Sequence, residues 1–262
     1  MTKELNIYPV KIEFSEDEKK EMKKWSVLPN VLPHDNFIML LMAPPRSGKS
    51  VLIMNLIYND IFNYKKIFDK IIFISPTLMN DKTLKHIVED DDVMKIHEYE
   101  DIHNIDGIIK GIIDDQKEHK EHTLIILDDM VGMLGNNNKE LNTLATRYRH
   151  FNISMIISSQ NYKSYGVLLR NCASHWVFFK TNMLKEQNKI MEDMNSYPNF
   201  KKYYDEATKE RYSFLFIDQL GLKLYKKFNE LLYNPDNEYK DNSTNKNIDD
   251  SNEHDNKMAT DK

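Results

Sequence analysis

The sequence predicts an α/β fold, in which a mainly parallel β-sheet carries helices on both faces. Apolar runs of strand length occur at Phe37–Met42, Ile71–Ile74 and Leu124–Leu127. Segments with apolar residues at helical spacing lie between these runs. Strands that are apolar throughout are buried on both faces, as in the parallel sheets of α/β proteins.

The first 36 residues are expected to form an N-terminal extension with one short helix. Ser15 and Glu18 form a capping-box pattern, and lysines follow them, which predicts a helix near residues 15–25. Two prolines after that segment indicate an extended connection to the first strand. Residues 1–10 contain no apolar stretch, so we expect no secretory signal.

Strands and helices continue to alternate along the chain. Further helices are expected at Gly48–Asp60, 81–90, 100–118, Lys139–His150 and Lys185–Asn195. Further strands are expected at Ile153–Ile157 and His175–Phe179. The segments Tyr212–Ile217 and Leu222–Phe228 are predicted to pair around Gly221 as a terminal β-hairpin.

From residue 234 to residue 262 the composition is dominated by Asn, Asp, Lys, Ser and Glu. Such a segment cannot bury enough apolar surface to offset the entropy lost on ordering. We therefore predict a disordered acidic tail over residues 234–262 and a folded domain over residues 1–233.

The overall charge limits how the chain could bind nucleic acid. The 262 residues include 36 basic and 41 acidic ones, for a formal net charge of −5. Binding through bulk positive charge is therefore not expected, and a local patch or a ring-shaped assembly would be needed. No segment approaches the ~18 consecutive apolar residues of a membrane span.

Cysteine and histidine offer no metal site. The only cysteine is Cys172, so neither a disulfide framework nor a zinc-binding cysteine pair is possible within the chain. The histidines lack metal-ligand spacing and are expected at the surface: His86, His97, His103, His119 and His122.

The segment Ala43–Ser50 carries the strongest chemical signal. It matches the phosphate-binding pattern G-x-x-x-x-G-K-[ST] at every fixed position except the first, and it joins a strand to a helix. Backbone N–H groups at a helix N-terminus attract phosphate. Lys49 is expected to reach the β- and γ-phosphates, and the Ser50 hydroxyl is expected to bind Mg²⁺. Residues 1–233 are therefore predicted to be a P-loop ATPase domain that binds ATP with Mg²⁺.

The loop departs from the usual pattern near its start. Ala43 replaces the first glycine, although an extended backbone before Pro44 accepts a Cβ atom. The two prolines have no N–H, but the residues nearest the phosphates keep theirs. The expected nucleotide-binding residues are Ala43, Pro44, Pro45, Arg46, Ser47, Gly48, Lys49 and Ser50.

Two carboxylates follow the apolar strand Leu124–Leu127. Ligand sites of open α/β sheets lie at the carboxyl ends of the strands. Asp128 is expected to hold Mg²⁺, directly or through water. Asp129 is expected to act as the general base toward the attacking water.

Further polar candidates flank the strand Ile153–Ile157. Gln160 follows it and is expected to contact the γ-phosphate and the attacking water, which would make it a sensor of nucleotide state. Arg149 precedes this strand and Arg170 follows it. Either arginine could complete the site of a neighbouring subunit in a ring ATPase, or could simply be a solvated charge.

These motifs together resemble those of the genome-packaging ATPases of large DNA viruses, the poxvirus-type members of the FtsK–HerA superfamily. The resemblance rests on Ser47–Ser50, the strand ending in Asp128 and Asp129, the segment Arg149–Ser154 and the strand end at Gln160. It covers roughly residues 37–180, with weaker support to about residue 228. Arg149–Ser154, followed by a strand that ends in glutamine, is its most specific part.

The resemblance implies a motor that drives double-stranded DNA into a preformed capsid as a ring of identical subunits. It implies that Lys49 and Ser50 contact phosphate and Mg²⁺, that Asp128 binds Mg²⁺, that Asp129 is the base and that Gln160 is the sensor. Arg149 is the candidate for action on a neighbouring subunit, while Arg170 remains open. The expected partners are DNA and capsid or portal components, and the expected location is the intracellular site of virion assembly or the virion.

Two other functions fit the motifs. A helicase or a P-loop kinase would use the same loop, although a kinase would need an arginine-rich lid that the sequence lacks. A nucleotide-binding assembly protein with little hydrolysis is compatible with the change at Ala43. DNA contacts of a motor would fall in the loops Gly132–Lys139 and Asn161–Gly166, through Lys139 and Lys163.

Overall fold

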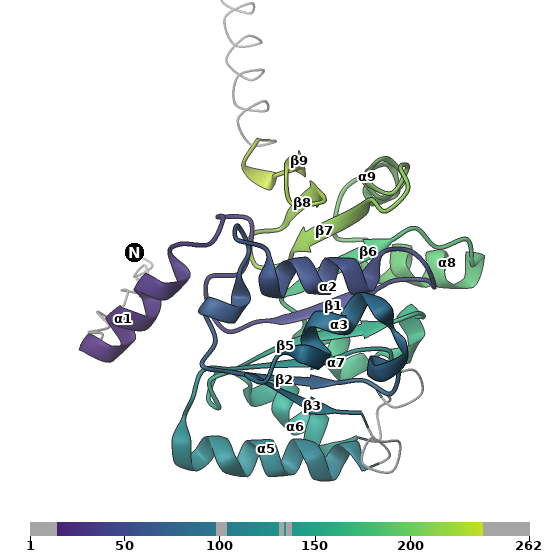
Figure 1. The fold of residues 1–262 in the computed structure, drawn as a ribbon. Coiled ribbons are helices and arrows are strands. Elements are labelled where there is room, and N and C mark those ends of the chain that lie inside the picture. Colours follow the sequence, from purple (N-terminus) through teal and green to yellow (C-terminus); the bar gives the residue numbers. More distant parts are fainter. Residues whose placement is uncertain (1–14, 98–103, 131–133, 135–137, 238–262) are drawn as a thin grey trace, which may run out of the picture.

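The computed structural model describes residues 15–97, 104–130, 134 and 138–237. They form a nine-stranded sheet with the order β3-β2-β4-β5-β1-β6-β7-β8-β9, covered by helices (Figure 1). The strands are β1 (Ile38–Met42), β2 (Lys70–Ile74), β3 (Val93–Ile96), β4 (Thr123–Leu127), β5 (Ile153–Ser159), β6 (His175–Phe179), β7 (Phe214–Asp218), β8 (Lys223–Lys226) and β9 (Glu230–Tyr233).

The α-helices between the strands follow the predicted alternation closely. They are α1 (Glu16–Trp25), α2 (Lys49–Tyr58), α3 (Lys85–Glu89), α5 (Ile105–His119), α6 (Lys139–Arg147), α7 (Val167–Cys172), α8 (Leu184–Asp193) and α9 (Phe200–Ala207). Short 3₁₀ turns η1 to η4 cover Tyr64–Lys66, Leu78–Asn80, Lys82–Leu84 and Tyr162–Ser164.

The pairing of the strands confirms a mainly parallel sheet. Strands β1 to β6 pair in parallel with their neighbours. Strands β7, β8 and β9 then extend the sheet in antiparallel fashion from β6. The predicted hairpin is therefore present as β7 and β8, but it does not end the sheet, because β9 pairs with β8.

Two hydrophobic cores lie on the two faces of the sheet. Along β1, Ile38, Leu40 and Met42 belong to one core, and Met39 and Leu41 belong to the other. Helices α5 to α9 contribute to the first core, and α1, α2 and α3 contribute to the second. Successive side chains of a strand point to opposite faces, so a strand covered on both sides must be apolar at every position.

Four elements were not predicted from the sequence: β3, α7, α9 and β9. Strand β3 has only four residues and lies at the edge of the sheet, where Met94 is exposed. Helix α7 has six residues, too few for a helical pattern to be distinct from a loop. These short elements depend on tertiary packing rather than on periodicity.

Several predictions concern residues that the structure does not describe. These are the absence of a signal at residues 1–10, the start of the helix at 100–103 with the surface position of His103, the disordered tail from residue 238 onward and most of the loop Gly132–Lys139. The side chain of Glu18, one half of the predicted capping box, is also outside the described part. Among the described residues, no helix is long and apolar enough to cross a membrane.

The prediction that His122 lies at the surface is wrong. Its side chain is buried between Trp25 and Phe68, with ring centroids 5.0 Å and 4.7 Å away. Trp25 is the last residue of α1, so this cluster attaches the N-terminal helix to the sheet. Burial lowers the pKa of His122 from 6.5 to about 4, although Asp69 partly opposes the shift.

Mild acid should destabilise the protein through His122. Between pH 6.5 and pH 4 the unfolded chain binds a proton that the folded chain does not bind. The free energy of unfolding should therefore fall as the pH drops through this range, by at most about 3 kcal/mol for this residue. Urea denaturation at a series of pH values measures the effect.

A matched variant, His122→Phe, keeps the ring contacts without the proton site. It should lose part of the pH slope, and His175, whose pKa burial also lowers to about 4, should supply part of the slope that remains. Identical slopes in the two proteins would contradict the assignment to His122.

Candidate functional site

The predicted phosphate-binding loop joins β1 to α2 at the carboxyl ends of the parallel strands. The Ala43 N–H donates to the Ser159 carbonyl at 2.9 Å, so Ala43 continues the pairing of β1 with β5. Its side chain is buried, and its φ is negative. The structure therefore explains why alanine can stand here, since this position needs no glycine-specific backbone.

Gly48, at the N-terminus of α2, is the position in the loop that requires a glycine. Its φ is 102°, in the left-handed region, and a Cβ atom there would lie 3.2 Å from Cδ1 of Tyr212. Within the described part of the chain, no side chain caps this end of α2, and the first turn of the helix holds no acidic residue. The end of the helix is therefore available to an anion.

Lys49 connects the loop to the two predicted carboxylates. Its Nζ lies 2.8 Å from Oδ1 of Asp128 and 3.3 Å from Oδ1 of Asp129. Asp128 is buried, whereas Asp129 is 20% exposed in its side chain. These contacts bring Lys49, Asp128 and Asp129 together at the carboxyl ends of the parallel strands.

Ser158, which the sequence analysis did not single out, bonds the side chain of Asp128 and the backbone of Asp129. Its Oγ donates to Oδ1 of Asp128 at 2.5 Å and accepts from the Asp129 N–H at 3.1 Å. Gln160 Nε2 donates to Oδ1 of Asp129 at 3.0 Å. Strands β4 and β5 are neighbours, which brings the serine and the glutamine alongside the acidic pair.

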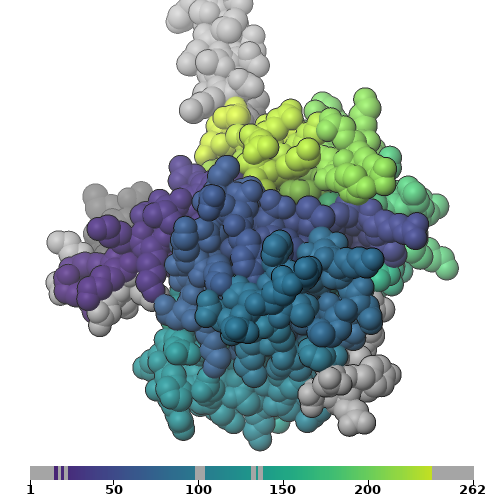
Figure 2. Space-filling model, viewed as in Figure 1, coloured from purple at the N-terminus to yellow at the C-terminus, as the bar shows by residue number. Residues whose placement is uncertain are grey.

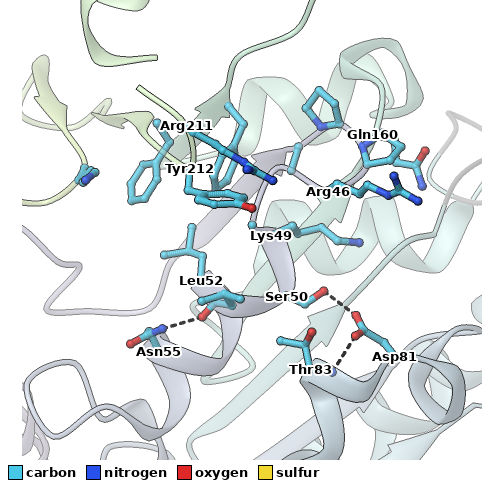
Figure 3. A pocket seen from close by; sticks show the side chains of 18 of the residues that line it. Arg46, Lys49, Ser50, Leu52, Asn55, Asp81, Thr83, Gln160, Arg211 and Tyr212 are labelled. Carbon is cyan, nitrogen blue, oxygen red and sulfur yellow. Dashed lines mark hydrogen bonds between the residues drawn. The ribbon is translucent and has the colours of Figure 1, made fainter. Parts of the chain in front are cut away.

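Asp81 is a second residue that sequence reasoning missed. Its Oδ2 accepts from Ser50 Oγ at 2.7 Å, and its Oδ1 accepts from the Thr83 N–H at 2.8 Å (Figure 3). Burial raises the pKa of Asp81, but these hydrogen bonds outweigh it and leave the pKa below the ordinary value. In the sequence, Asp81 shows only the pattern of a helix-capping residue, which it also is.

A cavity of about 1050 Å³ surrounds the loop. One side is formed by the loop, Asp81, Asp129 and Gln160. The other side comes from the C-terminal part of the sheet, which the sequence did not connect with the site. The residues on that side are Phe179, Arg211, Tyr212, Phe214, Lys227, Phe228 and Asn229.

The two candidate arginines lie apart from the cavity. Arg149 is exposed and precedes β5, whereas Gln160 follows β5. The two residues therefore lie at opposite ends of this strand. Arg170 is enclosed within the fold, with Nε 3.3 Å from Oδ2 of Asp193 and Nη1 donating to the Tyr165 carbonyl at 2.9 Å. Neither arginine completes the site of its own chain.

The residues present suit a nucleotide with a magnesium ion. Ser50, Asp81 and Asp128 offer oxygen atoms, the ligand type that Mg²⁺ prefers. Ser47 Oγ is buried in the loop and has no hydrogen-bond partner among the residues that the structure describes. A hydroxyl of this kind beside an uncapped helix end can donate to a bound phosphate.

The two lysines considered for DNA contact are both exposed. Lys139 begins α6, and Lys163 lies in η4, just after Gln160. The Lys163 N–H donates to Oε2 of Glu186 at 3.2 Å, which fixes the backbone of this loop. Lys163 is therefore presented on the same edge of the sheet as the cavity.

The parallel sheet, the loop before α2 and the acidic end of β4 define a P-loop nucleoside-triphosphatase fold. Comparison with family models gives a match over residues 26–222 to the family described as Poxvirus A32 protein. The chain belongs to this family, which confirms the poxvirus-type resemblance that the motifs indicated.

Solved structures share the same fold. The genome-packaging NTPase B204 of Sulfolobus turreted icosahedral virus 2, in complex with ATP-gammaS, is 17% identical, with a TM-score of 0.54 over 75% of this chain and 96% of that one. B204 of Sulfolobus turreted icosahedral virus, described as a DNA-packaging ATPase, is 17% identical, with a TM-score of 0.56 over 72% of this chain and 96% of that one. The comparison with curated proteins gave no match.

Replacement of Lys49 should lower the stability of the protein in the absence of nucleotide. Lys49→Ala leaves Asp128, whose side chain is 1% exposed, without its cation. The loss of one partner from a buried ion pair should cost about 3 kcal/mol of unfolding free energy. Urea denaturation in the absence of nucleotide and Mg²⁺ measures this loss.

The double variant Lys49→Ala with Asp128→Asn is the matched control. It removes the stranded negative charge and should recover part of the lost stability. A single Lys49→Ala variant as stable as the wild type would show that the ion pair does not support the fold.

Proposed function

We propose that this chain is an ATP-hydrolysing motor that moves double-stranded viral DNA into the capsid during virion assembly. One observation carries the hydrolytic part: Lys49, Asp128, Asp129 and Gln160 meet within hydrogen-bonding distance at the edge of the sheet. The packaging part is supported by the family and by the fold shared with NTPases described as genome-packaging enzymes.

In this proposal the loop from Ala43 to Ser50 holds the triphosphate, and Ser50 with Asp128 would hold Mg²⁺. The ion, when bound, neutralises charge on the phosphates. The uncapped N–H groups of α2 and the Ser47 hydroxyl would bind phosphate oxygens. Asp81 would keep the Ser50 side chain in one orientation through its 2.7 Å hydrogen bond.

The contacts of Lys49 indicate how binding and hydrolysis are linked. In the structure, Lys49 contacts both Asp128 and Asp129. When Lys49 turns to the phosphates, Asp129 loses its cationic partner and is free to accept a proton from water. Gln160, which donates to Asp129, is placed to orient that water and to respond to the γ-phosphate.

A ring of identical subunits would explain the position of Arg149. The exposed guanidinium stacks on its neighbour Tyr148, with Cζ 5.4 Å from the ring centroid. It lies at the edge of the sheet away from its own cavity and could enter the site of an adjacent subunit. The ion pair of Arg170 with Asp193 makes that residue a weaker candidate.

The first test is steady-state ATP hydrolysis, with and without long duplex DNA, by the wild type and by Asp129→Ala. We expect hydrolysis that duplex DNA stimulates, and a loss of about 10²-fold or more in the variant, because a general base contributes 10²–10⁴-fold. Asp129→Ala should still bind ATP, since the loop is intact.

Other outcomes separate the alternative functions. ATP binding without turnover, with or without DNA, would favour a nucleotide-binding assembly protein. Separation of duplex strands in a displacement assay would favour a helicase. No binding of ATP would contradict the proposal altogether.

The role of Arg149 can be tested by mixing subunits. Arg149→Ala should lower hydrolysis by about 10³-fold if the arginine acts on the neighbouring site. A mixture of Arg149→Ala and Asp129→Ala subunits should regain activity, because one supplies the intact site and the other the arginine. A mixture no more active than its components would exclude this arrangement.

A further inference from the structure

The cavity extends from the phosphate-binding loop to a second wall that β7, β8 and β9 support. Arg211 and Tyr212 lie just before β7, and residues 227–229 link β8 to β9. The Lys227 N–H donates to the Phe214 carbonyl at 2.9 Å, which ties these two loops together. Figure 2 shows the C-terminal strands, in green and yellow, packed against the region of α2.

The size of the cavity exceeds what a triphosphate alone requires. About 1050 Å³ is available, at the upper limit of the roughly 300–1,000 Å³ of pockets that hold drug-sized ligands. The phosphate groups would lie at the N-terminus of α2. The remaining space therefore lies between α2 and the second wall.

Apolar and aromatic side chains line much of this remaining space, beside the polar residues Asn55, Lys227 and Asn229. Phe228 lies with its ring centroid 5.4 Å from that of Phe62 and 5.2 Å from that of Phe214. Leu52 of α2 and Phe179 line the same cavity. These side chains offer nothing to a phosphate, but they match the flat apolar surface of a nucleobase.

Tyr212 stands between the two parts of the cavity (Figure 3). Its ring contacts the position of Gly48 in the loop, and the Arg211 guanidinium lies over the ring, with Cζ 4.6 Å from the centroid. The residue as a whole is nevertheless 53% exposed, with the Arg211 guanidinium over one face of its ring.

The backbone of this wall is held in an uncommon conformation. Tyr212 has φ 62° and Lys227 has φ 55°, both in the left-handed region that bulky residues rarely adopt. Non-glycine residues keep such backbone angles where the surrounding structure fixes a side chain in place, often at a ligand site. Both strained residues face the same cavity.

We infer that this wall is a nucleoside-binding subsite, in which the base of the nucleotide stacks on Tyr212. The inference rests on the proposed function, since it assigns the base of the ATP whose phosphates the loop would hold. Stacking needs an exposed aromatic face beside the phosphate site, and Tyr212 supplies one directly against Gly48. The Arg211 guanidinium lies over one face of the ring, so the base would stack on the opposite face.

The test compares ATP with inorganic tripolyphosphate, which has the phosphates but no base. In the wild type, with Mg²⁺, ATP should bind at least about 10-fold more tightly than tripolyphosphate, as expected for one stacked base. This comparison needs no variant. Equal affinities would overturn the inference and leave the phosphate-binding loop intact.

Two variants at Tyr212 locate the effect. Tyr212→Gly removes the ring, and glycine accepts the φ of 62° without strain, so the fold should be retained. It should weaken ATP binding about 10-fold and leave tripolyphosphate binding unchanged. Tyr212→Phe keeps the ring and should bind both ligands as the wild type does. Isothermal titration calorimetry measures the dissociation constants.

Three other outcomes of these titrations would contradict the assignment of Tyr212 to the base. ATP affinity unchanged in Tyr212→Gly would overturn the inference alone. An equal loss for ATP and tripolyphosphate would also overturn it, because Tyr212 would then only support the loop through Gly48. Failure of the wild type to bind either ligand would overturn the proposed function together with this inference.

Discussion

Lys49 lies at the start of α2, and its contacts with Asp128 and Asp129 link the ends of β1 and β4, the two strands that flank β5. Ser158 on β5 completes the junction by hydrogen bonds to both aspartates. A buried carboxylate needs a cation or hydrogen-bond donors, and this site supplies both. A bound triphosphate would attract the same Lys49 ammonium group. Such a ligand would therefore compete with Asp128 and Asp129 for Lys49.

The two faces of the sheet contribute differently to this site. The core beneath α2 positions the loop, and the core beneath α5 and α6 supports the β4 and β5 ends. The antiparallel strands β7 to β9 add the far wall of the cavity, with Tyr212 against Gly48. A parallel sheet alone would leave the loop open to solvent, so the antiparallel extension gives the cavity its depth and its aromatic lining.

Charged side chains divide between local packing and exposed surface. Arg170 pairs with Asp193, and its Cζ lies 5.2 Å from the centroid of the Tyr162 ring. Its charge is therefore used in contacts within the same chain. Arg149 keeps its charge at the surface, beyond reach of its own cavity. The sequence could not distinguish these two arginines as candidates for a neighbouring site. Positions along the chain do not show which carboxylate a side chain will contact in the fold.

The sequence by itself determined the parallel part of the fold and the core of the site. Apolar runs reveal strands buried on both faces, and the order of parallel strands brings Lys49, Asp128 and Gln160 to one edge. Only the tertiary structure revealed the contacts of Asp81, Ser158 and Tyr212 at the site. Each of these acts through a contact with a residue far away in the chain, and no local pattern records such a contact. Short edge elements and left-handed loops depend on packing for the same reason, since their own residues do not favour those conformations.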